Sequence, residues 1–106
     1  MTVEKIIMAV DEMKENGISE ETKIVWLNEV ESRVECEIRG KSPEDFVPIN
    51  SGEDLLSVPA PYSRIYLIYL CAMIAFVKGE FDFYNKGILD YEAAFCEYAK
   101  YYIRTR

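Results

Sequence analysis

Residue types that could do chemistry are few in this sequence. None of the 106 residues is a histidine, so the usual general base and every Ser–His or Cys–His nucleophile pair are missing. The five glycines are scattered and form no phosphate-binding loop. Neighbouring carboxylates occur at Glu20/Glu21 and at Glu31/Glu35, and we expect both pairs on solvated helix faces, where carboxylates are poor catalysts. The sequence therefore predicts no enzyme and no catalytic residue.

Metal and cofactor sites are not expected either. The three cysteines, Cys36, Cys71 and Cys96, are far apart and form no CxxC pair. Without histidine, we expect no zinc site of the common Cys/His type, and the acids lack the spacing of an EF-hand loop. We expect the cysteines to be reduced and to pack as small hydrophobic residues.

The charge distribution argues against nucleic-acid binding. The chain carries a net charge of −7, and residues 1–40 hold ten acids against five bases. Proteins that bind nucleic acid cluster Lys and Arg instead, so we expect no specific nucleic-acid binding. The longest uncharged apolar run, residues 65–77, is too short for a bilayer, which needs about 20 residues. No signal peptide and no membrane role are expected.

The apolar spacing steps in threes and fours and predicts helices over residues 2–16, 19–39, 61–78 and 80–104. Thr2 and Ser19 are the expected N-caps, and glycines end the first three helices. The third helix is apolar on every side, so we place it at the centre of the fold. The predicted fold class is all-α: a single four-helix bundle-like domain, residues 1–106, with a long irregular loop at residues 41–60.

Two surface features leave alternatives open. Glu29, Glu31, Arg33, Glu35 and Glu37 are expected on the wet face of the second helix. That face is either simply solvated or an electronegative surface that repels or guides a polyanion. The loop at residues 41–60 is long for a compact domain, so we expect it to be either functional or mobile.

Aromatic residues suggest an interaction surface. A 3–4 seam of large residues runs along the last helix, and such a stripe is usually core. Eight tyrosines in 106 residues are nevertheless more than a small core uses, and tyrosine is enriched at interfaces. The candidate protein-interaction residues are Phe46, Val47 and Ile49 in the loop, with Tyr62, Tyr66, Tyr69, Tyr98, Tyr101 and Tyr102.

Four segments carry a resemblance to a known family: WLNEVE (26–31), LLSVPAPYSRIY (55–66), GEFDFYN (79–85) and FCEYAKYYIRTR (95–106). Together with the tyrosine-rich apolar helix, they resemble small prophage proteins of tailed phages in Gram-positive bacteria, the head–tail connectors (adaptors). The resemblance implies a mostly helical subunit that assembles as a ring between portal and tail, around the DNA channel. It brings no catalytic residues.

The first hypothesis is therefore a phage virion structural protein. Its partners would be copies of itself, the portal and tail-completion proteins, and it would lie in the host bacterial cytoplasm during assembly and then at the head–tail junction. The alternative is a small acidic adaptor or regulator that binds one partner protein through the same aromatic surface.

Overall fold

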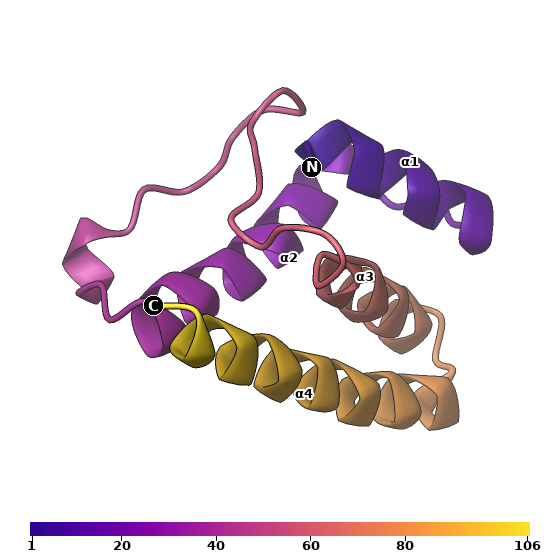
Figure 1. Cartoon of the computed structure of the whole chain (residues 1–106). Coiled ribbons are helices and arrows are strands. Elements are labelled where there is room, and N and C mark those ends of the chain that lie inside the picture. The colour runs from indigo at the N-terminus through magenta and orange to yellow at the C-terminus, as the bar shows by residue number, and fades with distance from the viewer.

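Four α-helices and no β-strand make up the computed structural model, which describes all 106 residues. They are α1 (Val3–Met13), α2 (Glu20–Arg33), α3 (Arg64–Val77) and α4 (Phe81–Arg104) (Figure 1). The prediction of a small all-α fold is thus confirmed. Helix α3 lies in the middle of the picture, with α1, α2 and α4 around it.

Both predicted N-caps are present. The Thr2 hydroxyl accepts a hydrogen bond from the Lys5 backbone N–H at 3.3 Å, and the Ser19 hydroxyl accepts one from the Thr22 N–H at 3.2 Å. Each cap satisfies one of the backbone donors that a helix N-terminus leaves free. The first two helices therefore begin at the positions that local sequence chemistry selects.

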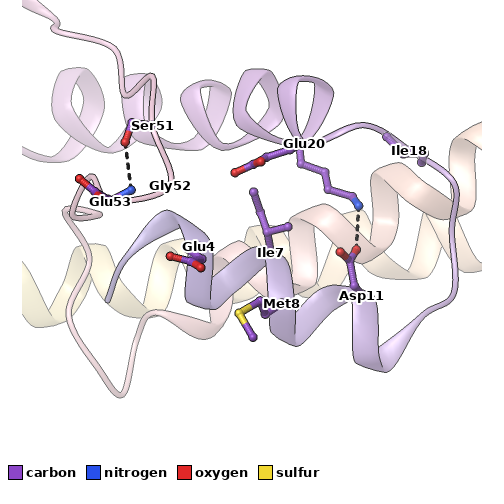
Figure 2. Close-up of a pocket in the computed structure, with 10 residues that line it drawn as sticks. Glu4, Ile7, Met8, Asp11, Ile18, Glu20, Ser51, Gly52 and Glu53 are labelled. Carbon is purple, nitrogen blue, oxygen red and sulfur yellow. Dashed lines mark hydrogen bonds and ion pairs between the residues drawn. The ribbon is translucent and has the colours of Figure 1, made fainter.

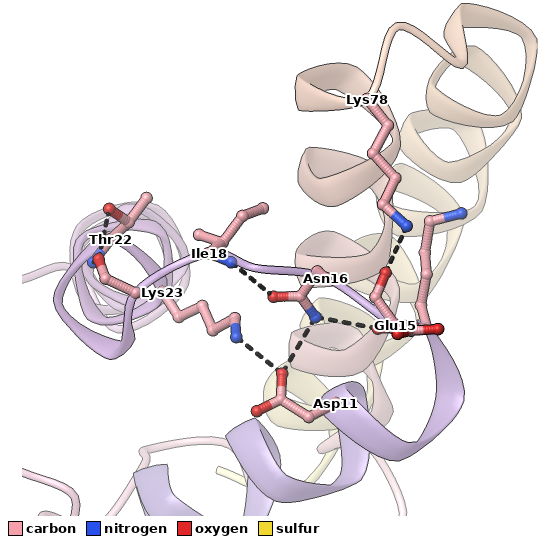
Figure 3. Close-up of polar contacts among 9 residues, drawn as sticks. Asp11, Glu15, Asn16, Ile18, Thr22, Lys23 and Lys78 are labelled. Atoms are coloured by element: carbon pink, nitrogen blue, oxygen red, sulfur yellow. Dashed lines mark hydrogen bonds and ion pairs between the residues drawn. The ribbon is translucent and has the colours of Figure 1, made fainter.

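Helix α1 ends at Met13, three residues before the predicted boundary. The reason is Asn16, whose side chain bonds the chain on both sides (Figure 3). Its Oδ1 accepts from the Ile18 N–H at 3.1 Å, and its Nδ2 donates to the Lys14 carbonyl at 2.9 Å. An asparagine that binds nearby backbone groups competes with the helix, which explains the early end.

Helix α2 continues into a π-helical turn, Val34–Ile38, instead of staying α-helical to residue 39. The Arg39 N–H reaches the Val34 carbonyl at 3.1 Å, five residues back. Gly40 follows with φ +75°, a left-handed conformation that glycine adopts without strain. The predicted extent of this helix is close to the observed one, whereas the change of helix type carried no sequence signal.

The irregular segment between α2 and α3 is attached to the body of the protein. Its only regular piece is a 3₁₀ turn, Pro43–Asp45, before it arches over and returns beside α1 (Figure 1). There the Val3 N–H donates to the Asp54 carbonyl at 3.0 Å, and the Glu4 N–H donates to the Gly52 carbonyl at 2.9 Å. The returning part of the loop thus accepts hydrogen bonds from backbone N–H groups at the start of α1. An isolated β-bridge also joins Thr2 to Leu55.

Helices α3 and α4 form an antiparallel hairpin. Helix α3 begins at Arg64, three residues later than predicted, because residues 60–63 form a turn. The hairpin turn uses Gly79 at φ +78°. The core gathers around α3, with Ile65, Tyr66, Leu70 and Ile74 all fully buried.

The aromatic seam of α4 is covered over only part of its length. Tyr91, Phe95 and Tyr98 are buried, as core residues should be. Phe81, at the beginning of the same seam, is 56% exposed. The stripe is therefore core in its C-terminal half and exposed at its N-terminal end.

Candidate functional site

A buried polar cluster lies between α2, α3 and the end of the loop. Glu31 is only 3% exposed, and its carboxylate accepts hydrogen bonds from the Tyr66 hydroxyl at 2.5 Å and from the Ser57 N–H at 2.9 Å. The Tyr66 hydroxyl in turn accepts from the Val58 N–H at 2.9 Å. Burial is the main cause that raises the pKa of Tyr66, and the nearby Glu31 carboxylate raises it further.

This cluster corrects two predictions. Glu31 was expected on the wet face of its helix and is buried instead, because the loop at Ser57–Val58 covers it. Tyr66 was a candidate contact residue, yet it is fully buried. Its hydroxyl donates to Glu31 and accepts from the Val58 N–H, so both hydrogen bonds stay inside the chain. Its role in this structure is to hold the loop against α2.

Tyr98 is also an interior residue, with 1% of its surface exposed. Its hydroxyl accepts a hydrogen bond from Arg39 Nη2 at 3.1 Å, and the same nitrogen donates to the Ser57 carbonyl at 3.0 Å. Arg39 thus joins the end of α2, the loop and α4. Tyr98 belongs to this internal junction, so its assignment to a contact surface was wrong.

Three of the predicted tyrosines do gather at a half-buried edge around Tyr98. The ring of Tyr62 lies 4.7 Å from that of Tyr101 and 5.7 Å from that of Tyr98, centroid to centroid. Tyr102 lies 6.3 Å from Tyr98. The guanidinium groups of Arg39 and Arg106 lie over the Tyr102 ring at 5.5 and 5.8 Å, within the range of cation–π attraction.

Tyr69 lies apart from that edge. Its ring packs against Tyr91 at 4.8 Å, and its hydroxyl donates to Glu29 at 2.6 Å. Partial burial is the main cause that raises the pKa of Tyr69, and the hydrogen bond to Glu29 raises it further. Its surroundings are those of a helix–helix contact between α2, α3 and α4.

The loop residues do not join the tyrosine edge. Ile49 is held to α2 by Asn28, which donates to the Ile49 carbonyl and accepts from the Ile49 N–H, both at 2.9 Å. Phe46 is partly buried and forms no ring pair with the tyrosines. Val47 is 79% exposed. The nine predicted residues therefore do not form one surface. Tyr66 and Tyr98 are in the interior, and the others are divided among the tyrosine edge, the contact around Tyr69 and the loop.

Sequence reasoning missed an exposed apolar region at the end of the α3–α4 hairpin. Phe76, Val77, Phe81 and Phe83 are 49%, 58%, 56% and 67% exposed. The Phe76 ring contacts Phe81 at 5.8 Å. The sequence shows that α3 is apolar on all sides, but which of its side chains stay uncovered depends on how the helices pack. Phe81 and Phe83 are two residues apart and so project to different sides of α4, where the Lys14 ammonium lies 5.5 Å from the centre of the Phe83 ring. Exposed apolar side chains gathered at one end of a small protein commonly mark an interaction site.

An ion pair between a nearly buried lysine and an exposed aspartate connects α1 and α2. Lys23 is nearly buried, and its ammonium lies 2.7 Å from Asp11 Oδ1 (Figure 3). The bond with Lys23, followed by that with Asn16, lowers the pKa of Asp11. At the same end, the Lys78 ammonium donates to the Glu15 carbonyl and so ties α3 to the link after α1.

Partial burial raises the pKa of the Cys71 thiol, which lowers the fraction of reactive thiolate. No three His, Cys, Asp or Glu side chains group together as they would around a metal ion. No helix combines the length and the apolar character that crossing a membrane requires.

What the fold defines is a small all-α protein. A scan against protein-family models found no match, and searches of curated proteins and of solved structures found none either.

Proposed function

We propose that this chain is a structural subunit of a phage virion, a head–tail connector that oligomerises and docks portal or tail components. The observation that carries the proposal is the exposed apolar end of the α3–α4 hairpin, formed by Phe76, Val77, Phe81 and Phe83. Leaving this much apolar surface in water is unfavourable for an isolated subunit, and covering it by a neighbour is favourable.

Two further observations support it. The four segments that resemble connector proteins include residues 79–85, which contain two of these exposed phenylalanines. The half-buried edge around Tyr62, Tyr101 and Tyr102 lies at the other end of α4, so the long helix presents contact surface at both ends. A subunit with two separate contact regions can bind a neighbour and a second component at once.

The test is the mass of the chain in solution, measured by light scattering across concentration with and without the portal protein of the same genome. A connector associates with itself, with the portal, or with both. Binding to a single unrelated protein, without either association, would favour the acidic adaptor instead. A strict monomer that never binds portal protein would remove the connector proposal.

A further inference from the structure

The loop between α2 and α3 has two halves that are held in different ways. The second half, residues 49–58, is bonded to the body of the protein, where Asn28 holds Ile49 with two hydrogen bonds of 2.9 Å. The Gly52 carbonyl accepts a hydrogen bond from the Glu4 N–H at 2.9 Å. Gly52 also packs closely on α1, because a Cβ added to it would lie 3.4 Å from the Cβ of Glu4 (Figure 2). This half therefore forms a fixed base for the rest of the loop.

The first half, residues 42–48, makes no hydrogen bond to any other part of the chain. It starts after Lys41, whose N–H donates to the Glu35 carbonyl at 2.9 Å. From there on, all hydrogen bonds lie within the segment, such as that from the Phe46 N–H to the Pro43 carbonyl at 3.3 Å. In Figure 1 the 3₁₀ turn of this half lies at the outer edge of the molecule. The segment is thus held at its ends and presented to the surroundings between them.

The side chains of this half combine apolar and acidic character. Val47 is 79% exposed, more than any other large hydrophobic residue of the chain. Glu44 and Asp45 precede it, and both are exposed and free of ion pairs. A single exposed valine is common on protein surfaces. Together with two unpaired acids on a short projecting segment, however, it has the composition of an acidic recognition motif.

Prolines restrict the backbone of the segment. Pro43 begins the 3₁₀ turn with its φ already fixed by the ring. Phe46 is extended, with φ −70° and ψ 127°, and Val47 is biased towards the same conformation because it precedes Pro48. A segment whose shape is restricted before binding loses less conformational entropy when it binds. The loop is therefore suited to docking as it stands.

The grooves of this chain do not match the acids of the segment. Lys14, Lys23 and Arg64 line these grooves but are already paired with acids of the same chain. The remaining base, Lys86, shares its groove with Asp90. The net charge of −7 also makes copies of the chain repel one another. The segment therefore fits a different protein better than another copy of this one.

We propose that residues 42–48 are a docking segment that inserts Val47 into an apolar pocket of a different protein. Glu44 and Asp45 then meet Lys or Arg side chains at the border of that pocket. This inference rests on the proposed function, in which another component of the virion supplies the pocket. It adds which segment of the chain binds and what chemistry the receiving surface has.

Calorimetric titration of the whole chain with portal protein of the same genome tests this contact. Val47→Ser should weaken binding about tenfold, which is the affinity that burying a valine side chain contributes. Glu44→Lys should weaken it by a similar factor, because it places like charges together at the border of the pocket. Leu89→Ser, at a similarly exposed apolar residue of α4, and Glu12→Lys, at an exposed acid of α1, are the matched controls and should bind as wild type does. All four side chains are exposed, so the melting temperatures should stay unchanged.

The salt dependence of binding is a second readout. Salt screens the attraction between opposite charges, so portal binding should weaken as sodium chloride is raised from 0.05 to 0.5 M. Glu44→Lys should make this slope shallower, whereas Glu12→Lys should leave it unchanged. The slope is opposite in sign to that expected for copies of one acidic chain, which repel one another less as salt is raised.

The outcomes separate this inference from the proposed function. If the Val47 and Glu44 variants bind portal protein as tightly as wild type does, the docking segment is disproved and the proposed function stands. Loop variants that weaken self-association instead would assign the segment to a second copy and overturn the inference. A wild-type chain that self-associates but does not bind portal protein would also overturn it, while keeping the oligomerising subunit. A chain that does neither would contradict the proposed function, and the docking segment with it.

Discussion

At the scale of single residues, Glu31 is the side chain on which the loop depends. It is nearly buried and serves both the Tyr66 hydroxyl and the Ser57 N–H. Removing it with Glu31→Ala leaves the buried Tyr66 hydroxyl and the part-buried Ser57 N–H without this partner, and an unsatisfied buried group costs about 1–3 kcal/mol. We expect a loss of about 2–4 kcal/mol in the free energy of unfolding, measured by urea denaturation.

Glu29→Ala is the matched control for that prediction. Glu29 lies on the same helix and also accepts from a tyrosine hydroxyl, that of Tyr69, but it is exposed. Water can replace its hydrogen bond, so the loss should stay below about 1 kcal/mol. Equal losses for the two variants would mean that burial of Glu31 contributes nothing beyond an ordinary surface contact.

The Asp11–Lys23 pair predicts a pH dependence. The pKa of Asp11 is lowered from its ordinary value of 3.8 in the folded state, chiefly by the bond with Lys23. The pair therefore contributes its full stability above pH 3.8 and loses it as the pH falls below that value. Asp11→Asn should be less stable than wild type at pH 7, and the difference should shrink towards pH 2–3 in thermal melts. A constant difference would contradict this assignment.

At the scale of elements, the α3–α4 hairpin depends on Gly87. Replacing glycine by alanine inside a helix normally stabilises it by up to about 1 kcal/mol. Here the new methyl group would meet Ala72 at 2.7 Å, a contact that neither helix can relieve by moving a flexible side chain. We expect Gly87→Ala to lower the free energy of unfolding by about 1–3 kcal/mol, from denaturant titration.

Gly17→Ala provides the comparison at a glycine where a Cβ meets nothing within 4 Å. It should be neutral or slightly stabilising because it restricts the unfolded chain. If the two substitutions behaved alike, close packing of α3 on α4 at Gly87 would be disproved.

The elements also show what local sequence can predict. The caps at Thr2 and Ser19 and the stop at Gly79 follow from backbone donors and glycine geometry, so they were predictable. The early end of α1 and the late start of α3 depend on Asn16 and on the turn at residues 60–63, which are local competitors of the helix that periodicity does not reveal. Periodicity also cannot show what a distant segment covers.

That limit explains the errors at the candidate surface. Glu31 was placed in solvent because a carboxylate in a helix usually is, yet the loop 26 residues later closes over it. Tyr66 and Tyr98 were assigned to the surface from tyrosine number alone, whereas internal partners for their hydroxyls depend on tertiary contacts with Glu31 and Arg39. The exposure of apolar side chains at the hairpin end likewise depends on how the helices pack, which local sequence does not show.

At the scale of the whole molecule, the net charge of −7 works against self-association, because copies of the chain repel one another. Salt screens this repulsion, and the screening length falls from about 10 Å at 0.1 M to about 3 Å at 1 M.

Covering the apolar hairpin end must outweigh this repulsion, so self-association should strengthen as sodium chloride is raised from 0.05 to 0.5 M. Sedimentation equilibrium at several salt concentrations measures this slope. Association that weakens with salt would indicate that contacts between opposite charges hold the copies together instead.

The central claim is that this chain is an assembly subunit whose exposed α3–α4 hairpin is covered by a neighbour. The most direct test is light scattering of wild type and Phe83→Ser over a wide concentration range, with and without portal protein. The account predicts a wild-type mass that rises above the 12.3 kDa of one chain, and a Phe83→Ser mass that stays there at an unchanged melting temperature. A wild-type mass of 12.3 kDa under every condition would contradict it.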